Sequence, residues 1–170
     1  MAEPNITNFK GINIEGFRRY SEREEYTDLG GYKVDTRKVY SIYTDYGTFE
    51  ITDYLLENVT NSPSRNPSIF RNGRSVTIKD LDLRSITGTE NNDSYYLSNT
   101  QVGDVYLNND NGIGDKIIIG RESEVYKIHG DSNDKIMINS DTGRSALAGT
   151  NVNPSNIIDM RRETKSEISR

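Results

Sequence analysis

The only histidine of the chain, His129, is the first residue to consider for acid–base chemistry. It precedes Gly130-Asp131, a pair that is typical of a turn. A histidine that acts as a general base needs an orienting carboxylate and a nucleophile, and the sequence identifies neither. We therefore expect His129 to lie at the surface, and we assign no catalytic residue to the chain.

Two pairs of carboxylates offer the alternative of hydrolysis without histidine or cysteine. Asp80 and Asp82 are spaced two residues apart, and so are Glu122 and Glu124. On a strand this spacing places both carboxylates on one face, where they could serve a glycoside hydrolase. The same spacing is typical of a solvated strand face. A carboxylate-based glycoside hydrolase therefore stands as one alternative function.

Two loops rich in oxygen-bearing side chains could hold calcium. Residues 108–112 read Asn-Asn-Asp-Asn-Gly, and residues 131–134 read Asp-Ser-Asn-Asp. Calcium prefers oxygen ligands of this kind, but neither loop has the spacing of an EF-hand. Asn, Asp and Gly are also the residues that tight turns require. We expect turns and no metal site here, with calcium binding left open.

The composition excludes several other classes of protein. The absence of cysteine rules out disulfides and thiolate metal sites. No motif that cradles phosphate occurs, so we expect no cofactor. The net charge of -5 at pH 7 argues against a nucleic-acid partner. No apolar run approaches the ~20 residues that span a bilayer, and residues 1–10 lack the features of a signal peptide, so we expect no membrane partner.

The residue types favour strands strongly over helices. Val, Ile and Thr together number 40, whereas Leu and Ala number 11. Branching at Cβ suits a strand and restricts the side chain in a helix. We predict a mainly β fold, an antiparallel hairpin or meander sandwich or a small barrel. Three segments are expected: an extended N-terminal arm over 1–31, a β domain over 32–150 and a C-terminal helical tail over 151–170.

Local patterns place a few elements within these segments. Asn72-Gly73 stands between strand-forming residues and predicts a type I′ hairpin turn. Short helical pieces are expected near 53–58, with Thr52 as the N-cap, and near 154–165, beginning at Pro154.

An internal echo raises a second possibility for the β domain. Residues 105–119 and residues 125–138 share Val-Tyr followed by Asp-Lys-Ile-x-Ile, 20 residues apart. A short β-solenoid with ~20-residue coils would repeat in this way, but such arrays usually need three copies. We therefore prefer a meander whose hairpins reuse the same turn chemistry.

The alternating apolar residues define the expected core. The inward-facing residues are Val39, Phe49, Ile51, Val76, Ile78, Leu107, Ile117, Ile119, Val125, Ile136 and Ile138. Ile118 lies between two of them and must face the opposite side of its strand. We expect that a second sheet or a second subunit covers it.

These observations predict a non-enzymatic structural subunit of a larger assembly. Polar chains rich in hairpins, Asn, Gly and Tyr are common among virion proteins, an analogy that leads us to expect a phage virion component such as a decoration, connector or fibre-anchoring protein. Its expected partners are copies of itself and capsid, connector or tail proteins in the virion. A carbohydrate-binding β module that uses exposed Tyr and Asn or Asp side chains is the main alternative.

The residues expected at the interfaces are apolar, aromatic or arginine side chains of the arms and strands. They are Phe9, Ile12, Phe17, Arg18, Arg19, Tyr40, Tyr106, Ile118, Tyr126, Arg161 and Arg162.

Overall fold

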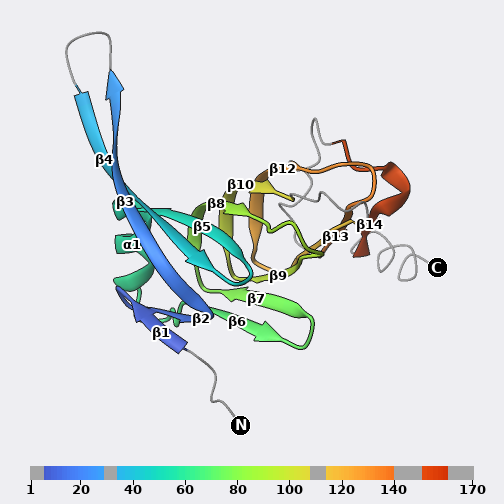
Figure 1. Cartoon of the computed structure of the whole chain (residues 1–170), viewed down its shortest axis with the longest axis horizontal. Coiled ribbons are helices and arrows are strands. Elements are labelled where there is room, and N and C mark those ends of the chain that lie inside the picture. Colours follow the sequence, from blue (N-terminus) through green and yellow to red (C-terminus); the bar gives the residue numbers. More distant parts are fainter. Residues whose placement is uncertain (1–5, 29–33, 108–113, 140–150, 161–170) are drawn as a thin grey trace.

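The computed structural model describes residues 6–28, 34–107, 114–139 and 151–160 (Figure 1). Almost all of its regular structure is β, which confirms the prediction of a mainly β chain. The strands form two sheets that face each other across an apolar core. No helix in the described ranges is long and apolar enough to cross a membrane.

The two sheets are built from alternating segments of the chain. The first sheet contains, in spatial order, β1 (Ile6–Phe9), β2 (Ile12–Glu15), β6 (Ser68–Asn72), β7 (Ser75–Lys79), β9 (Ser94–Ser98), β11 (Lys116–Ile119), β13 (Lys135–Ile138) and β14 (Ile157–Asp159). The second contains β12 (Glu124–His129), β10 (Gln101–Tyr106), β8 (Asp82–Thr87), β5 (Gly47–Thr52), β4 (Val34–Thr44) and β3 (Phe17–Asp28).

From β7 to β13 the chain winds as a β-solenoid, because successive strands alternate between the two sheets. β7, β9, β11, β13 and β14 pair in parallel, and so do β8, β10 and β12. The echo in the sequence becomes a ladder here, since Lys116 pairs with Lys135 and Ile117 with Ile136. The preference for a meander was wrong for these residues, and the antiparallel sandwich or small barrel is not confirmed. In a parallel coil, equivalent positions of successive turns pair with each other. Turns whose sequences resemble each other only weakly can therefore still form the parallel strand ladder.

The strands before β7 form a mainly antiparallel cap over one end of this solenoid, although β2 and β6 pair in parallel. β1 pairs with β2, and β3, β4 and β5 form a meander, all antiparallel. The residues expected to form an N-terminal arm therefore belong to both sheets. Phe9 lies between the sheets, with its ring centroid 4.9 Å from that of Tyr20 and 5.8 Å from that of Tyr40.

The predicted core is confirmed, and it extends into the cap. All eleven residues expected to face inward are buried, and they belong to one continuous cluster apart from Val39, which is also fully buried. Ile118, on the outer face of β11, is half-buried. Tyr96 of β9, Met137 of β13 and Ile158 of β14 lie in one row with Ile118 on this outer face, because the parallel pairing puts them in register.

Three local predictions met different outcomes. The helix near 53–58 is confirmed as α1 (Asp53–Thr60), and the Thr52 hydroxyl accepts a hydrogen bond from the Leu55 N–H at 3.2 Å. The β6–β7 hairpin also forms, but its two-residue loop is Gly73-Arg74, because Asn72 pairs with Ser75. Gly73 has a φ of 65°, so the residue with the left-handed backbone is the glycine.

The expected C-terminal helix is not confirmed. Pro154–Asn156 forms one 3-10 turn, and the chain then enters β14. β14 adds to the parallel ladder beside β13, where Ile136 pairs with Ile157, so the sheet determines the conformation of Ile157 and Ile158. Residues 161–165 of the expected helix lie outside the described residues.

Candidate functional site

A column of aspartates lines one corner of the solenoid. Each aspartate directly precedes a strand of the first sheet: Asp93 precedes β9, Asp115 precedes β11 and Asp134 precedes β13. The winding of the chain therefore stacks the three residues. The Asp93 N–H donates to Asp115 Oδ1 at 2.7 Å, and the Asp115 N–H donates to Asp134 Oδ1 at 2.8 Å. The carboxylates of Asp115 and Asp134 thus each accept from a backbone N–H of the neighbouring coil, whereas the Asp93 carboxylate accepts from the N–H and the hydroxyl of Thr89. These bonds make the column part of the fold's construction.

Burial makes this column unusual electrostatically. The pKa of Asp115 is raised to about 7, mainly because burial disfavours the charged carboxylate. The charges of the neighbouring aspartates act in the same direction, and the hydrogen bond from the Asp93 N–H acts against them. Burial raises the pKa of Asp93 and of Asp134 as well. The Oδ2 atom of Asp115 is buried and has no hydrogen-bond partner among the described residues. The column therefore holds a carboxyl group that gains or loses its proton near neutral pH.

The oxygen-rich loops have separate outcomes. Residues 108–112 lie outside the described residues. In the second loop, Asp134 Oδ2 accepts from the Asp131 N–H at 2.8 Å, and Asp131 Oδ1 accepts from the Asn133 N–H at 2.9 Å. The described residues contain no group of three or more His, Cys, Asp or Glu side chains suited to a metal ion. Turn chemistry accounts for the second loop.

The opposite corner positions the carboxylate pairs considered for hydrolysis. Asp80, Asn99 and Glu122 occupy its successive turns, each with a positive φ, at 57°, 46° and 62°. Asp80 Oδ1 accepts from Asn99 Nδ2 at 3.0 Å, and Asp82 forms an ion pair with Arg65 at 2.7 Å. Asp80 and Glu122 therefore belong to the turns, whereas Asp82 and Glu124 begin strands β8 and β12. Neither pair of carboxylates forms the strand face that the spacing suggested.

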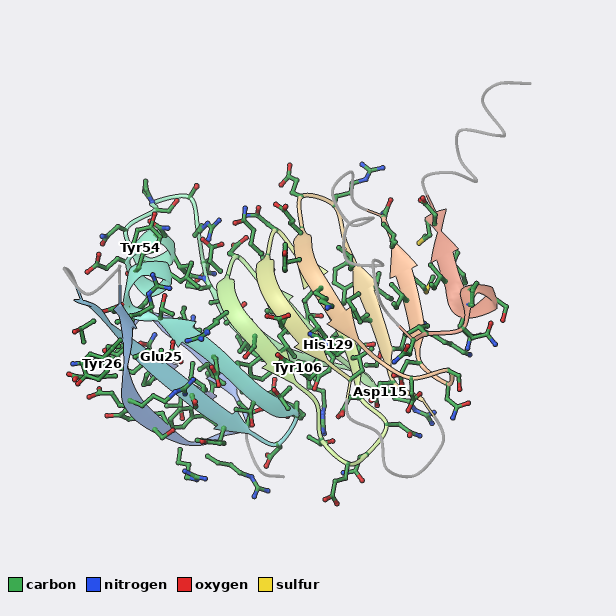
Figure 2. The ribbon with its side chains drawn as sticks, turned by 90° about the horizontal axis from the view of Figure 1, so that it is seen from above. Glu25, Tyr26, Tyr54, Tyr106, Asp115 and His129 are labelled. Carbon is green, nitrogen blue, oxygen red and sulfur yellow. The ribbon has the colours of Figure 1, made fainter. Side chains whose placement is uncertain are left out.

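His129 has closer partners than the sequence indicated. Its Nε2 lies 3.0 Å from Asp104 Oδ1, and its ring stacks on Tyr106 with centroids 4.4 Å apart and planes 7° apart. Figure 2 shows the Tyr106 and His129 side chains adjacent on the sheet. The parallel register of β10 and β12 creates this contact, because it places Tyr106 opposite His129. The sequence alone does not reveal the Asp104–His129 pair, because the pair depends on the register between β10 and β12.

A cleft of about 420 Å³ lies between α1 and the outer side of β8, β10 and β12. Its lining combines apolar, acidic, basic and amide side chains around one glycine. The residues that line it are Leu55, Asp82, Leu83, Arg84, Gln101, Val102, Gly103, Asp104, Glu124 and Tyr126. Sequence analysis singled out some of these residues separately, but nothing in it predicted their convergence.

The middle of the cleft is open because Gly103 has no side chain. The strand pairings on both sides place Gly103 at the level of Arg84 on β8 and of Tyr126 on β12. A Cβ atom at Gly103 would lie 2.6 Å from the Arg84 carbonyl oxygen, so the backbone approach requires glycine. Tyr126 is 72% exposed and forms one wall.

Ion pairs hold the base of the β3–β4 hairpin beside this cleft. Arg23 contacts Glu50 at 3.0 Å and Glu25 at 3.2 Å, and Glu25 also pairs with Arg84 of the cleft. The hydrogen bond from Arg84 is the main cause of the lowered pKa of Glu25. The ion pair with Glu25 holds the Arg84 side chain in position, and Arg84 still lines the cleft.

The residues expected at interfaces fall into different environments. Phe9, Ile12 and Tyr40 are buried in the chain's own core, so they are not available to a partner. Arg18 pairs with Asp45, and the Arg19 guanidinium lies 3.9 Å from the centroid of the Tyr43 ring.

The other expected interface residues are nearer the surface. Phe17 is half-buried against Phe9, and Ile118 is half-buried on the first sheet. Tyr106 and Tyr126 remain exposed. Arg161 and Arg162 lie outside the described residues.

Comparison of the chain with known protein families, with curated proteins and with solved structures finds no match.

Proposed function

We propose that the chain is a non-enzymatic structural subunit of a larger assembly and that it assembles through contacts with copies of itself and with other structural proteins. A phage virion is the setting we propose, on the analogy of composition given above. The observation that carries the proposal is the β3–β4 ribbon, whose outer part extends away from the body (Figure 1).

The ribbon continues well beyond the sheet that supports it. β3 and β4 pair as far as Asp28 with Val34, whereas β5 pairs with β4 only as far as Val39 with Thr52. Among the described residues, the outer part therefore consists of two strands alone. A two-stranded hairpin is at best marginally stable in water, so this length of ribbon favours a contact that covers it.

The outer ribbon also carries an aromatic side chain suited to such a contact. Tyr26 is 67% exposed, and its hydroxyl donates to Glu24 at 3.1 Å. Figure 2 shows Tyr26 and Glu25 on the ribbon, at the end of the molecule opposite to β14. Tyrosine is enriched at protein interfaces because it combines a large apolar surface with a polar tip.

Analytical ultracentrifugation and native mass spectrometry test this proposal. We expect the full chain to form oligomers, and we expect association to be lost when an Asn-Gly turn replaces residues 26–36 and joins the paired residues Glu25 and Arg37. Tyr26→Ala should weaken association in part. Tyr54→Ala is the matched control, because Tyr54 is 63% exposed but lies on α1.

A full chain that stays monomeric up to its solubility limit would overturn self-assembly. Oligomers of unchanged affinity in the shortened variant would overturn the role of the ribbon. The virion setting has its own test, mass spectrometry of purified phage particles, in which the chain must appear at a fixed ratio to the capsid protein.

A further inference from the structure

We propose that the cleft between α1 and the second sheet binds carbohydrate, with Tyr126 as the stacking platform. This site is separate from the outer ribbon, so the inference does not rest on the assembly role. It assigns the carbohydrate-binding alternative of the sequence analysis to one particular surface, which contains the expected interface residue Tyr126.

The exposed tyrosine provides the first argument. Tyr126 is 72% exposed although it is a large aromatic residue on a strand, and it borders a hollow of about 420 Å³. A volume of this size lies within the range of small-ligand sites. An aromatic ring at the edge of such a hollow offers a flat apolar surface, and the C–H face of a sugar ring matches it.

The polar lining provides the second argument. Gln101 and Arg84 supply N–H donors, whereas Asp104 and Glu124 supply carboxylate acceptors, all on the same cleft. Sugar hydroxyls both donate and accept hydrogen bonds, so they can use this mixture. An anionic ligand would face several carboxylates, and a simple cation would face the Arg84 guanidinium. A neutral polyhydroxylated ring suits the whole lining best.

The third argument is that neighbours already hold the polar groups in place. Asp82 pairs with Arg65 at 2.7 Å, Arg84 pairs with Glu25, and Asp104 contacts His129 at 3.0 Å. Side chains fixed before binding lose less conformational entropy when the ligand arrives. The open Gly103 position lets a ring approach the sheet between Arg84 and Tyr126.

A glycan array of neutral oligosaccharides, followed by calorimetric titration of the glycan that binds best, tests the inference. We expect Tyr126→Ala to weaken binding about tenfold. Tyr126→Phe should keep most of the affinity, because it keeps the ring. Tyr54→Ala should bind as the unchanged chain does, since Tyr54 is similarly exposed but is not among the residues that line the cleft.

A second variant separates binding from folding. Gln101→Ala changes an exposed residue of the lining, and it should weaken glycan binding while leaving the thermal unfolding midpoint in place. Binding to no glycan on the array would overturn the inference, and so would binding that is equal in Tyr126→Ala and in the unchanged chain. Sedimentation of Tyr126→Ala shows whether assembly persists, so failure of this inference and failure of the assembly role are distinguishable.

Discussion

The antiparallel cap, residues 6–72, and the parallel coils, residues 75–159, solve the same packing problem in different ways. In the coils, equivalent positions stack, so Asp lies on Asp and Ile on Ile. In the cap, paired residues do not come from equivalent positions of a repeat, as where Tyr40 pairs with Ile51. The coils therefore repeat one local solution, while the cap ends the stack with contacts that are particular to each strand.

The difference matters because both regions share one core. The buried cluster runs from Phe9, Ile12 and Ile14 of the cap to Ile136 and Ile138 of the last coils. Repeat arrays need end units that close off the stacked core. The cap supplies that closure at one end, so we expect it to be required for the stability of the coils.

The largest expected effect tests the coil core. Ile117→Ala should lower the free energy of unfolding by about 2–5 kcal/mol, because Ile117 is fully buried and the cavity cannot fill completely. Ile118→Ala, one residue away on the half-buried outer face, should have a clearly smaller effect on folding. Urea denaturation measures both, and equal losses would contradict the assigned faces.

A change of similar size tests whether the cap is integral to the fold. Ile12→Ala should also lower the free energy of unfolding by about 2–5 kcal/mol, since Ile12 is fully buried between the sheets. Urea unfolding should keep a single transition. A loss of less than about half a kilocalorie per mole, the range of surface substitutions, would mean that these residues form a separable arm.

A property found only in the coils is the response of the aspartate column to pH. Folding raises the pKa of Asp115 to about 7, above the value near 4 expected in the unfolded chain. The stability due to this group is therefore fully present below about pH 4, and it is lost as the pH rises through about 7. Thermal unfolding between pH 4.5 and 8 should show this decline, with a total on the order of a few kcal/mol.

Asp115→Asn should flatten the decline, because asparagine cannot ionise and its Oδ1 can still accept the Asp93 N–H. Asp93 and Asp134 keep part of the slope, since burial also raises their pKa values. Glu122→Gln, at an exposed position of the opposite corner, is the control and should change the slope little. An unchanged slope in Asp115→Asn would show that another group causes it.

The smallest expected effect concerns the ion pairs where the cap meets the coils. Arg84→Gln removes the contact between β8 and Glu25 of the ribbon, at a site that is partly exposed on both sides. Such pairs contribute roughly 0.2–1 kcal/mol and are screened by salt. The difference in unfolding free energy between variant and unchanged chain should shrink in high salt, and a larger, salt-independent loss would indicate a buried packing role.

The sequence predicts the two regions unequally well. Alternation of apolar residues identifies the buried faces of strands in both, as Phe49 and Ile117 show, because burial on one face imposes a period of two. The hairpin at Asn72-Gly73 was found but displaced by one residue, since the glycine, and not the asparagine, adopts the left-handed backbone. Local chemistry thus locates elements more reliably than it sets their register.

What the sequence could not supply was the partner of each strand. The choice between hairpin and coil for residues 125–138 depends on long-range pairing, and both arrangements use the same turn residues. The cleft followed from that choice, because Arg84, Gly103 and Tyr126 share a level only when β8, β10 and β12 run parallel. The sequence analysis missed β14 as a whole for the same reason, since the parallel ladder overrides the helix-starting Asn153-Pro154 pair.

The parallel winding also means that the length of the body along the stack of coils depends on the number of coils. Strands in a sheet lie about 4.8 Å apart, so each added or removed coil changes that dimension by about that amount. The coils that begin at β9, β11 and β13 meet through the same aspartate corner, and β11 and β13 also share an apolar ladder. A coil of this kind could therefore be gained or lost without new chemistry at these joints. The separation between the ribbon and the last strand therefore changes in steps of one strand spacing.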